Sequence, residues 1–151
     1  YWNNEEETNK VLKDGWLHTG DIGIFENGYL KITDRKKDIL ITPGGDNISP
    51  VKIENELSNS KFIDQSIVYG DNKPYLVALL VLSDDNINVT QDQIKKELDI
   101  INKNLSKIEN IKKFFIINEK FSIENGMLTP TLKLKRYKIV TKYKNQFEKL
   151  Y

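Results

Sequence analysis

The sequence has no cysteine, one methionine and one histidine among its 151 residues. The absence of cysteine excludes a disulfide framework and a thiolate nucleophile, and it is compatible with a reducing compartment. His18 is the sole imidazole that could act as a general base. No serine or cysteine nucleophile stands at a recognisable spacing from it, so we expect His18 to be structural. We also expect no metal site.

Three further absences narrow the functional class. No apolar run approaches the roughly 18 residues of a membrane span, and no glycine-rich phosphate cradle occurs. Basic and acidic residues number 23 and 22, which leaves a formal charge of +1 and no nucleic-acid footprint. The chain begins at Tyr1 rather than at methionine, and no signal peptide follows. From these features we expect a piece of a longer intracellular protein.

The most informative stretch runs from residue 15 to residue 50. Two short apolar runs flank Glu26-Asn27-Gly28, and Asn-Gly is the strongest short hairpin signal. Five consecutive charges then occupy positions 34–38. A buried strand does not carry unpaired charges, so we expect an exposed connection between two packed bodies. Residues 39–41 resume as a strand that stops at Thr42-Pro43-Gly44-Gly45.

Helices and strands follow from capping residues and apolar periodicity. A short helix is predicted over residues 4–13, with Asn4 as its N-terminal cap, and Ser49-Pro50 begins another. Thr90-x-x-Gln93 is a capping box that begins a third helix. Its apolar positions recur at spacings of four and three, namely Ile94, Leu98, Ile101, Leu105 and Ile108. A closing helix is predicted from Tyr137, Val140, Tyr143, Phe147 and Leu150.

The predicted sheet has three strands. Residues 65–69 and 75–82 are expected to pair as a hairpin, and residues 113–118 form the third strand. The run at 75–82 is almost continuously apolar, which is typical of a central strand covered on both faces. The fold class is therefore α+β, with two or three helices packed on a small three-stranded sheet.

The order of several short motifs resembles that of the AMP-forming acyl-CoA synthetases. These motifs are HTGD, a hairpin, ITDRKKD, GGDNISP and KIE. DRKKD, together with LTPTLKLKR at Leu128–Arg136, is most similar to the long-chain fatty acyl-CoA synthetase branch. The resemblance implies that residues 1–34 end a larger N-terminal adenylation domain, that residues 35–37 form a hinge, and that residues 38–151 form a C-terminal lid domain.

The resemblance also implies roles toward the nucleotide. Asp21 follows a Gly turn, and a carboxylate suits the vicinal hydroxyls of a ribose; from the residues alone it is more simply a turn-capping Asp. Arg35, one of only two arginines, is expected beside the nucleotide, where its planar fork suits a ribose or phosphate oxygen. Lys133 matches the catalytic lysine, whose ammonium would stabilise the adenylation transition state. Leu132 replaces the glycine found in much of the superfamily.

Lys37 matches the hinge position, where a large backbone rotation needs an exposed residue. Gly44 and Gly45 are expected to line the channel of the CoA pantetheine arm, because glycine lets a narrow ligand pass close to the backbone. A plain β-turn is the alternative for this pair. Ile41 stands where many relatives carry lysine, so no role of that lysine is transferred.

Together these features imply a C-terminal fragment of a fatty acyl-CoA synthetase that uses ATP with Mg²⁺, CoA and a fatty acid. The fragment would hold half a site and be inactive without the missing N-terminal domain. The parent is expected in the cytoplasm or peripherally associated with a membrane. Two alternatives stay open: the lid of an adenylating enzyme that loads a carrier-protein thiol, and a non-catalytic α+β interaction module.

Overall fold

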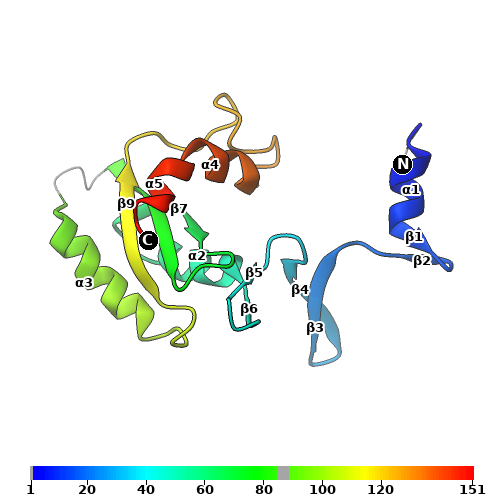
Figure 1. The fold of residues 1–151 in the computed structure, drawn as a ribbon, viewed down its shortest axis with the longest axis horizontal. Coiled ribbons are helices and arrows are strands. Elements are labelled where there is room, and N and C mark those ends of the chain that lie inside the picture. Colours follow the sequence, from blue (N-terminus) through cyan, green and yellow to red (C-terminus); the bar gives the residue numbers. More distant parts are fainter. Residues whose placement is uncertain (1, 85–88) are drawn as a thin grey trace. The chain divides into compact units, whose positions relative to one another are not determined.

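The computed structural model describes residues 2–84 and 89–151. The chain divides into two compact units, Tyr1–Ile39 and Leu40–Tyr151, which are described separately below (Figure 1). The predicted boundary at residues 35–37 falls close to this division, but its role as a hinge stays a prediction.

The first unit consists of a short helix and two hairpins. Helix α1 (Glu5–Val11) is capped by Asn4, whose Oδ1 accepts a hydrogen bond from the Glu7 amide at 3.0 Å. Strands β1 (Leu12–Lys13) and β2 (Trp16–Leu17) form a minimal antiparallel pair. Strands β3 (Asp21–Glu26) and β4 (Tyr29–Arg35) form the predicted Asn-Gly hairpin. Asn27 and Gly28 have φ values of +51° and +84°, as a tight two-residue turn requires.

This hairpin presents large apolar side chains to solvent, including Phe25 and Tyr29, each 80% exposed. Asp34 is the one buried residue among the described residues of the unit, so the prediction that the whole charged run is exposed was wrong. The physical reason is that β4 continues through Arg35, which pairs with Asp21 across the hairpin. Two of the five charges therefore belong to a strand.

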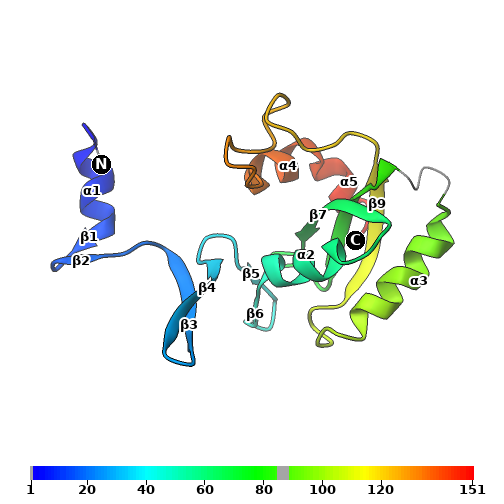
Figure 2. The same cartoon turned by 180° about the vertical axis from the view of Figure 1, so that it is seen from behind.

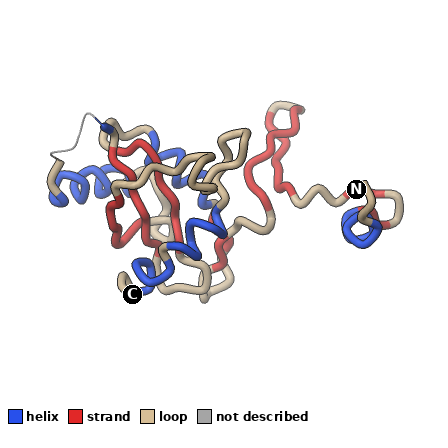
Figure 3. Tube along the Cα trace, turned by 90° about the horizontal axis from the view of Figure 1, so that it is seen from above, coloured by secondary structure: helices blue, strands red, loops and turns tan. Residues whose placement is uncertain are grey.

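The second unit is built on a three-stranded sheet. Strands β7 (Ile63–Tyr69), β8 (Leu76–Leu82) and β9 (Ile111–Ile117) lie in the order β7-β8-β9. The β7–β8 pair is antiparallel and the β8–β9 pair is parallel. As the apolar run predicts, β8 is central and almost wholly buried. Figure 3 shows the strands of this sheet in red.

Helices cover both faces of this sheet (Figure 2). Helices α2 (Pro50–Ser58) and α3 (Gln91–Asn102) pack on one face with the small β5–β6 pair (Leu40–Ile41 and Asn47–Ile48). Helices α4 (Arg136–Lys142) and α5 (Lys144–Glu148) pack on the other. Alternate residues of β8 divide between the two cores: Leu76, Ala78 and Leu80 in the first, Val77, Leu79 and Val81 in the second. The predicted α+β class is confirmed.

Three helix predictions were wrong in extent. The helix predicted over residues 4–13 ends at Val11, because Leu12–Lys13 pairs with Trp16–Leu17 as a strand. Helix α3 begins at the predicted capping box but ends at Asn102, and Ile108 is exposed. Asn102 ends it by bonding both the Ile111 amide and carbonyl, which directs the chain into β9. The closing helix is interrupted at Tyr143, whose φ of −102° and ψ of 17° separate α4 from α5. Within the described ranges no helix is both long and apolar enough to span a membrane.

Candidate functional site

Lys133 lies in a short hairpin that precedes α4. Leu128 and Leu134 form an antiparallel bridge at its base. Inside the hairpin, the Thr129 amide donates to the Lys133 carbonyl at 2.8 Å, and the Lys133 amide donates to Thr129 Oγ1 at 3.0 Å. The Lys133 side chain is exposed and forms no ion pair with any residue of the described ranges. The hairpin therefore fixes the backbone of Lys133 and leaves its ammonium group available to a ligand.

Leu132, directly before Lys133, has a left-handed backbone. Its φ is +60°, a region that L-residues other than Asn and Asp rarely adopt. Its amide donates to the Thr129 carbonyl at 2.9 Å, and its side chain is 69% exposed. The turn therefore demands a residue suited to positive φ, and glycine would adopt this conformation without steric strain.

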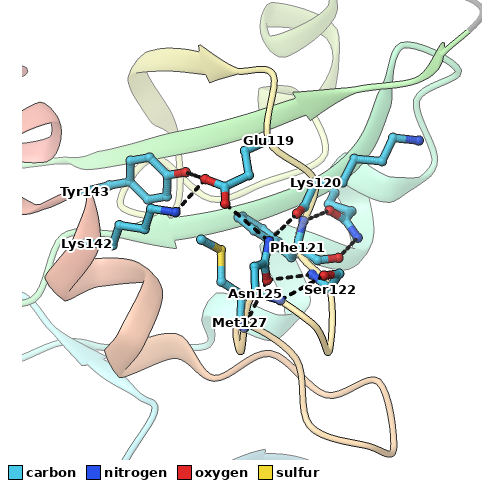
Figure 4. A network of polar contacts seen from close by, with 9 residues as sticks. Glu119, Lys120, Phe121, Ser122, Asn125, Met127, Lys142 and Tyr143 are labelled. Carbon is cyan, nitrogen blue, oxygen red and sulfur yellow. Dashed lines mark hydrogen bonds and ion pairs between the residues drawn. The ribbon is translucent and has the colours of Figure 1, made fainter.

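The segment that leads into the hairpin is held by a polar network around Glu119 (Figure 4). Glu119 accepts hydrogen bonds from Lys142 and from the Tyr143 hydroxyl, the latter at 2.7 Å. The Lys142 bond is the main cause that lowers the pKa of Glu119. Burial, followed by the bond to Glu119, raises the pKa of Tyr143 to about 12. Asn125 continues the network by donating to the Lys120 carbonyl at 2.7 Å, so residues 119–127 are fixed against α4.

The far end of the hairpin is held by an ion pair that sequence reasoning did not predict. Arg136 begins α4 and binds Glu54 of α2 through two parallel hydrogen bonds of 2.8 and 2.7 Å. Both side chains are largely buried, at 15% and 10% exposure. A signal was available, because Arg136 is the second of the two arginines and arginine is favoured for buried, two-bond carboxylate pairing.

The Gly44-Gly45 loop connects β5 to β6. The Thr42 amide donates to the Asp46 carbonyl, and the Gly45 amide donates to the Thr42 carbonyl, both at 2.9 Å. Gly45 has a φ of +87°, whereas the φ of Gly44 lies outside the left-handed region. Only Gly45 is thus required to be glycine by the conformation of the turn.

Asp21 and Arg35 are brought together as a cross-strand pair at the open end of the β3–β4 hairpin. Arg35 Nε lies 3.1 Å from Asp21 Oδ1. Both side chains retain exposure, with Arg35 more than half exposed, so the pair contributes only about 0–1 kcal/mol to stability. The arrangement places two hydrogen-bonding groups side by side at one end of the hairpin.

Lys37 lies in the turn after β4, where the Asp38 amide donates to the Arg35 carbonyl at 2.9 Å. Its side chain is exposed and makes no ion pair within the described part of the chain. His18 is also exposed. No group of three His, Asp or Glu side chains among residues 2–84 and 89–151 could hold a metal ion.

Comparison with known proteins identifies the family of the chain. Residues 37–151 match the family model described as the AMP-binding enzyme C-terminal domain. The chain belongs to this family. Over its whole length the chain is 34% identical to a long-chain-fatty-acid–CoA ligase of Mycobacterium tuberculosis and 38% identical to long-chain-fatty-acid–CoA ligase 5 of Mus musculus. It spans 29% and 26% of those two relatives.

Solved structures of adenylating enzymes share the fold of this AMP-binding C-terminal domain and of the segment before it. The adenylation domain of a carboxylate reductase from Mycobacterium chelonae superposes with a TM-score of 0.90 at 28% identity, covering 100% of this chain and 25% of that one. O-succinylbenzoate coenzyme A synthetase from Bacillus subtilis, solved with AMP, superposes with a TM-score of 0.70 at 30% identity, covering 91% of this chain and 26% of that one. The chain is thus part of the adenylate-forming acyl-CoA ligase family.

Proposed function

We propose that the chain is the C-terminal lid, with the preceding hairpin, of a long-chain fatty acyl-CoA synthetase. The observation that carries the proposal is its similarity over the whole chain to relatives named long-chain-fatty-acid–CoA ligases. Since the chain spans only about a quarter of their length, the proposed reaction belongs to a parent enzyme that also has an N-terminal domain. The chain alone is inactive under this proposal.

The proposed reaction has two steps. A carboxylate oxygen of the fatty acid attacks the α-phosphorus of Mg·ATP, the bond to the β-phosphate bridge oxygen breaks, and pyrophosphate leaves. The CoA thiol then loses its proton, its sulfur attacks the carbonyl carbon of acyl-AMP, and AMP leaves. The first step joins two anions and gathers negative charge at the α-phosphate, so a cation directed at those oxygens stabilises the transition state more than the reactants.

Lys133 supplies that cation in our proposal. Its backbone is fixed in the hairpin, and its side chain is exposed without a carboxylate partner among the described residues. An ammonium that is not neutralised by a neighbour keeps its full charge for the ligand. Asp21 and Arg35, which form one cross-strand pair, are proposed to hold the ribose and its neighbouring oxygens.

The thioester step uses other residues. Gly44 and Gly45 are proposed to line the path of the CoA pantetheine arm. The exposed turn at Lys37 is proposed to be the hinge that presents first the Lys133 hairpin and then the glycine loop to the active site of the parent enzyme. The Lys133 hairpin precedes α4, whereas the glycine loop precedes α2, so the two loops come from the two opposite layers of the second unit (Figure 2).

The experiment that tests the proposal is ATP–pyrophosphate exchange with the full-length parent and with this chain alone. Exchange by the parent that depends on a fatty acid, with none by the chain, is the expected result. CoA should then release the acyl group as a thioester. Exchange that starts with an aryl or amino acid and not with a fatty acid would contradict the substrate class.

A carrier-protein thiol is the alternative acceptor. The observation that favours it is the TM-score of 0.89 with an adenylation–carrier didomain of a carboxylic acid reductase from Segniliparus rugosus, at 26% identity. The two acceptors are separated by adding either free CoA or a phosphopantetheinylated carrier protein to preformed acyl-AMP. Transfer to free CoA at a rate matching overall turnover supports the ligase.

A further inference from the structure

The Glu54–Arg136 ion pair connects the helical layers on the two faces of the sheet. Arg136 Nη1 donates to Glu54 Oε1 at 2.8 Å, and Nη2 donates to Oε2 at 2.7 Å. Glu54 is in α2, which packs in the first core, and Arg136 begins α4, which packs in the second. A two-bond Arg–carboxylate contact fixes orientation as well as distance.

The pair also bonds the β7 backbone between the two helices. The Val68 amide donates to Glu54 Oε1 at 2.8 Å, and Arg136 Nη1 donates to the Val68 carbonyl at 3.2 Å. Strand β7 is at the edge of the sheet, where backbone groups would otherwise lack partners. Four hydrogen bonds thus connect α2, β7 and the first residue of α4 in one buried polar network.

The position of Arg136 in the chain links this buried polar network to Lys133. Arg136 lies three residues after Lys133, and the Lys135 amide closes the hairpin by donating to the Met127 carbonyl at 2.8 Å. Met127 and Leu128 are buried in the second core on the other side of the hairpin. The Lys133 hairpin is therefore held at both ends, by apolar burial before it and by the ion pair after it.

We propose that Arg136 and Glu54 are positioning residues for adenylation, which hold the Lys133 hairpin at a fixed place relative to the sheet. This inference rests on the function proposed above for Lys133. A buried ion pair is weak support for stability as such, because the desolvation of two charges offsets their attraction. Its two-bond geometry is better suited to fixing one orientation of a reactive loop.

The test uses the full-length parent with Glu54→Gln/Arg136→Met, alone and combined with Lys133→Ala. This double variant removes both buried charges, and the glutamine oxygen still accepts from the Val68 amide. Acyl-AMP formation should fall roughly 10- to 100-fold, the scale of a misplacement near 1 Å, with little change in the KM for fatty acid. In the Lys133→Ala background the further loss should be below about twofold, because the pair acts through that lysine.

Lys52→Met is the matched control. Lys52 is also in α2 and forms an ion pair with Glu109 at 2.7 Å, but Glu109 lies before β9 and not near the hairpin in sequence. This variant should leave acyl-AMP formation within about twofold of the wild type. Arg136→Lys, which keeps the charge and lacks the fork, replaces the double variant if that variant loses its native circular dichroism.

Each outcome decides the proposal. Equal fold losses with and without Lys133 would show a general structural role, and unchanged adenylation would show no role; both overturn it. Loss of the native fold in both Arg136 variants would overturn it too, because the pair would then hold the fold rather than the hairpin. If Lys133→Ala itself leaves adenylation intact, the proposed function fails; if Lys133→Ala impairs adenylation and the double variant does not, only the positioning role fails.

Discussion

Replacing Leu132 by glycine and by alanine should reverse the usual order of stability of those two residues. At an ordinary exposed position, glycine is less stable than alanine by about 0.5–1 kcal/mol because it loses more backbone entropy on folding. At Leu132, φ is +60°, and an L-residue in the left-handed region is strained by roughly 1–2 kcal/mol. Glycine removes that strain and alanine keeps it. The side chain is 69% exposed, and both variants lose the same few contacts.

The strain that glycine relieves, roughly 1–2 kcal/mol, minus its entropy cost, about 0.5–1 kcal/mol, leaves a difference of about 0–1.5 kcal/mol. Leu132→Gly should therefore be more stable than Leu132→Ala by about 0.7 kcal/mol, the middle of that range. The assay is urea unfolding followed by far-ultraviolet circular dichroism. Tryptophan fluorescence would not report on the second unit, since Trp2 and Trp16 both lie in the first.

Ile100 provides the matched control. It is exposed in α3, where the backbone is helical. Ile100→Ala should therefore be more stable than Ile100→Gly by about 1 kcal/mol. If Leu132 gave the same order as Ile100, the left-handed turn assigned before Lys133 would be wrong.

Three further predictions concern the loop, the network and the hinge. Gly45→Ala, at a φ of +87°, should lower the unfolding free energy by about 1 kcal/mol, whereas Gly44→Ala, with its nearest contact at 3.4 Å from Asp46 Oδ2, should change it by less than half as much in the same urea assay. The pKa of Tyr143 is raised from 10.0 to about 12, so its neutral hydroxyl stabilises the folded state fully below pH 10, and this contribution of about 2–3 kcal/mol is lost as pH rises to 12. Tyr143→Phe should therefore flatten the fall in the urea midpoint between pH 10 and pH 12. An unchanged fall would refute the raised pKa of Tyr143. Lys37→Pro in the full-length enzyme fixes φ near −65° and should depress CoA-dependent turnover while pyrophosphate exchange persists; loss of exchange alone would contradict the hinge.

Local signals predicted the parts of the fold that local physics determines. Asn27-Gly28 specified the hairpin because both residues accept positive φ, and Thr90 with Gln93 specified the start of α3 through a reciprocal cap. The apolar run of β8 indicated burial on both faces, and the structure confirms it. These features depend on neighbours within a few residues, so the sequence alone was sufficient.

Features that depend on distant partners were missed or misjudged. The apolar spacing continued past Asn102, but its bonds to the Ile111 backbone ended α3 there. Tyr143 fits a helical period, yet its hydroxyl bonds Glu119, 24 residues away, and the helix breaks at it. Arg136 is likewise connected to Glu54 across 82 positions. No local pattern contains such pairings.

The candidate site divides in the same way. The motif order placed Lys133 and the glycine pair in loops, and the structure shows the geometry of each loop without testing its role. Asp21 and Arg35 were assigned separately to the nucleotide, and the structure adds that they form one ion pair. The rarity of arginine pointed to a buried carboxylate partner for Arg136, but the identity of that partner could not be predicted, because Glu54 lies in the opposite helical layer.

The central claim is that Lys133 acts in adenylation and not in thioester formation. The most direct measurement compares the two half-reactions of the full-length Lys133→Ala enzyme: acyl-AMP formation from fatty acid and ATP, and CoA thioester formation from preformed acyl-AMP. Acyl-AMP formation should fall by about 100- to 1000-fold, the usual effect of removing one charge-stabilising group, while the thioester step should change far less. Equal losses in both half-reactions would contradict the account.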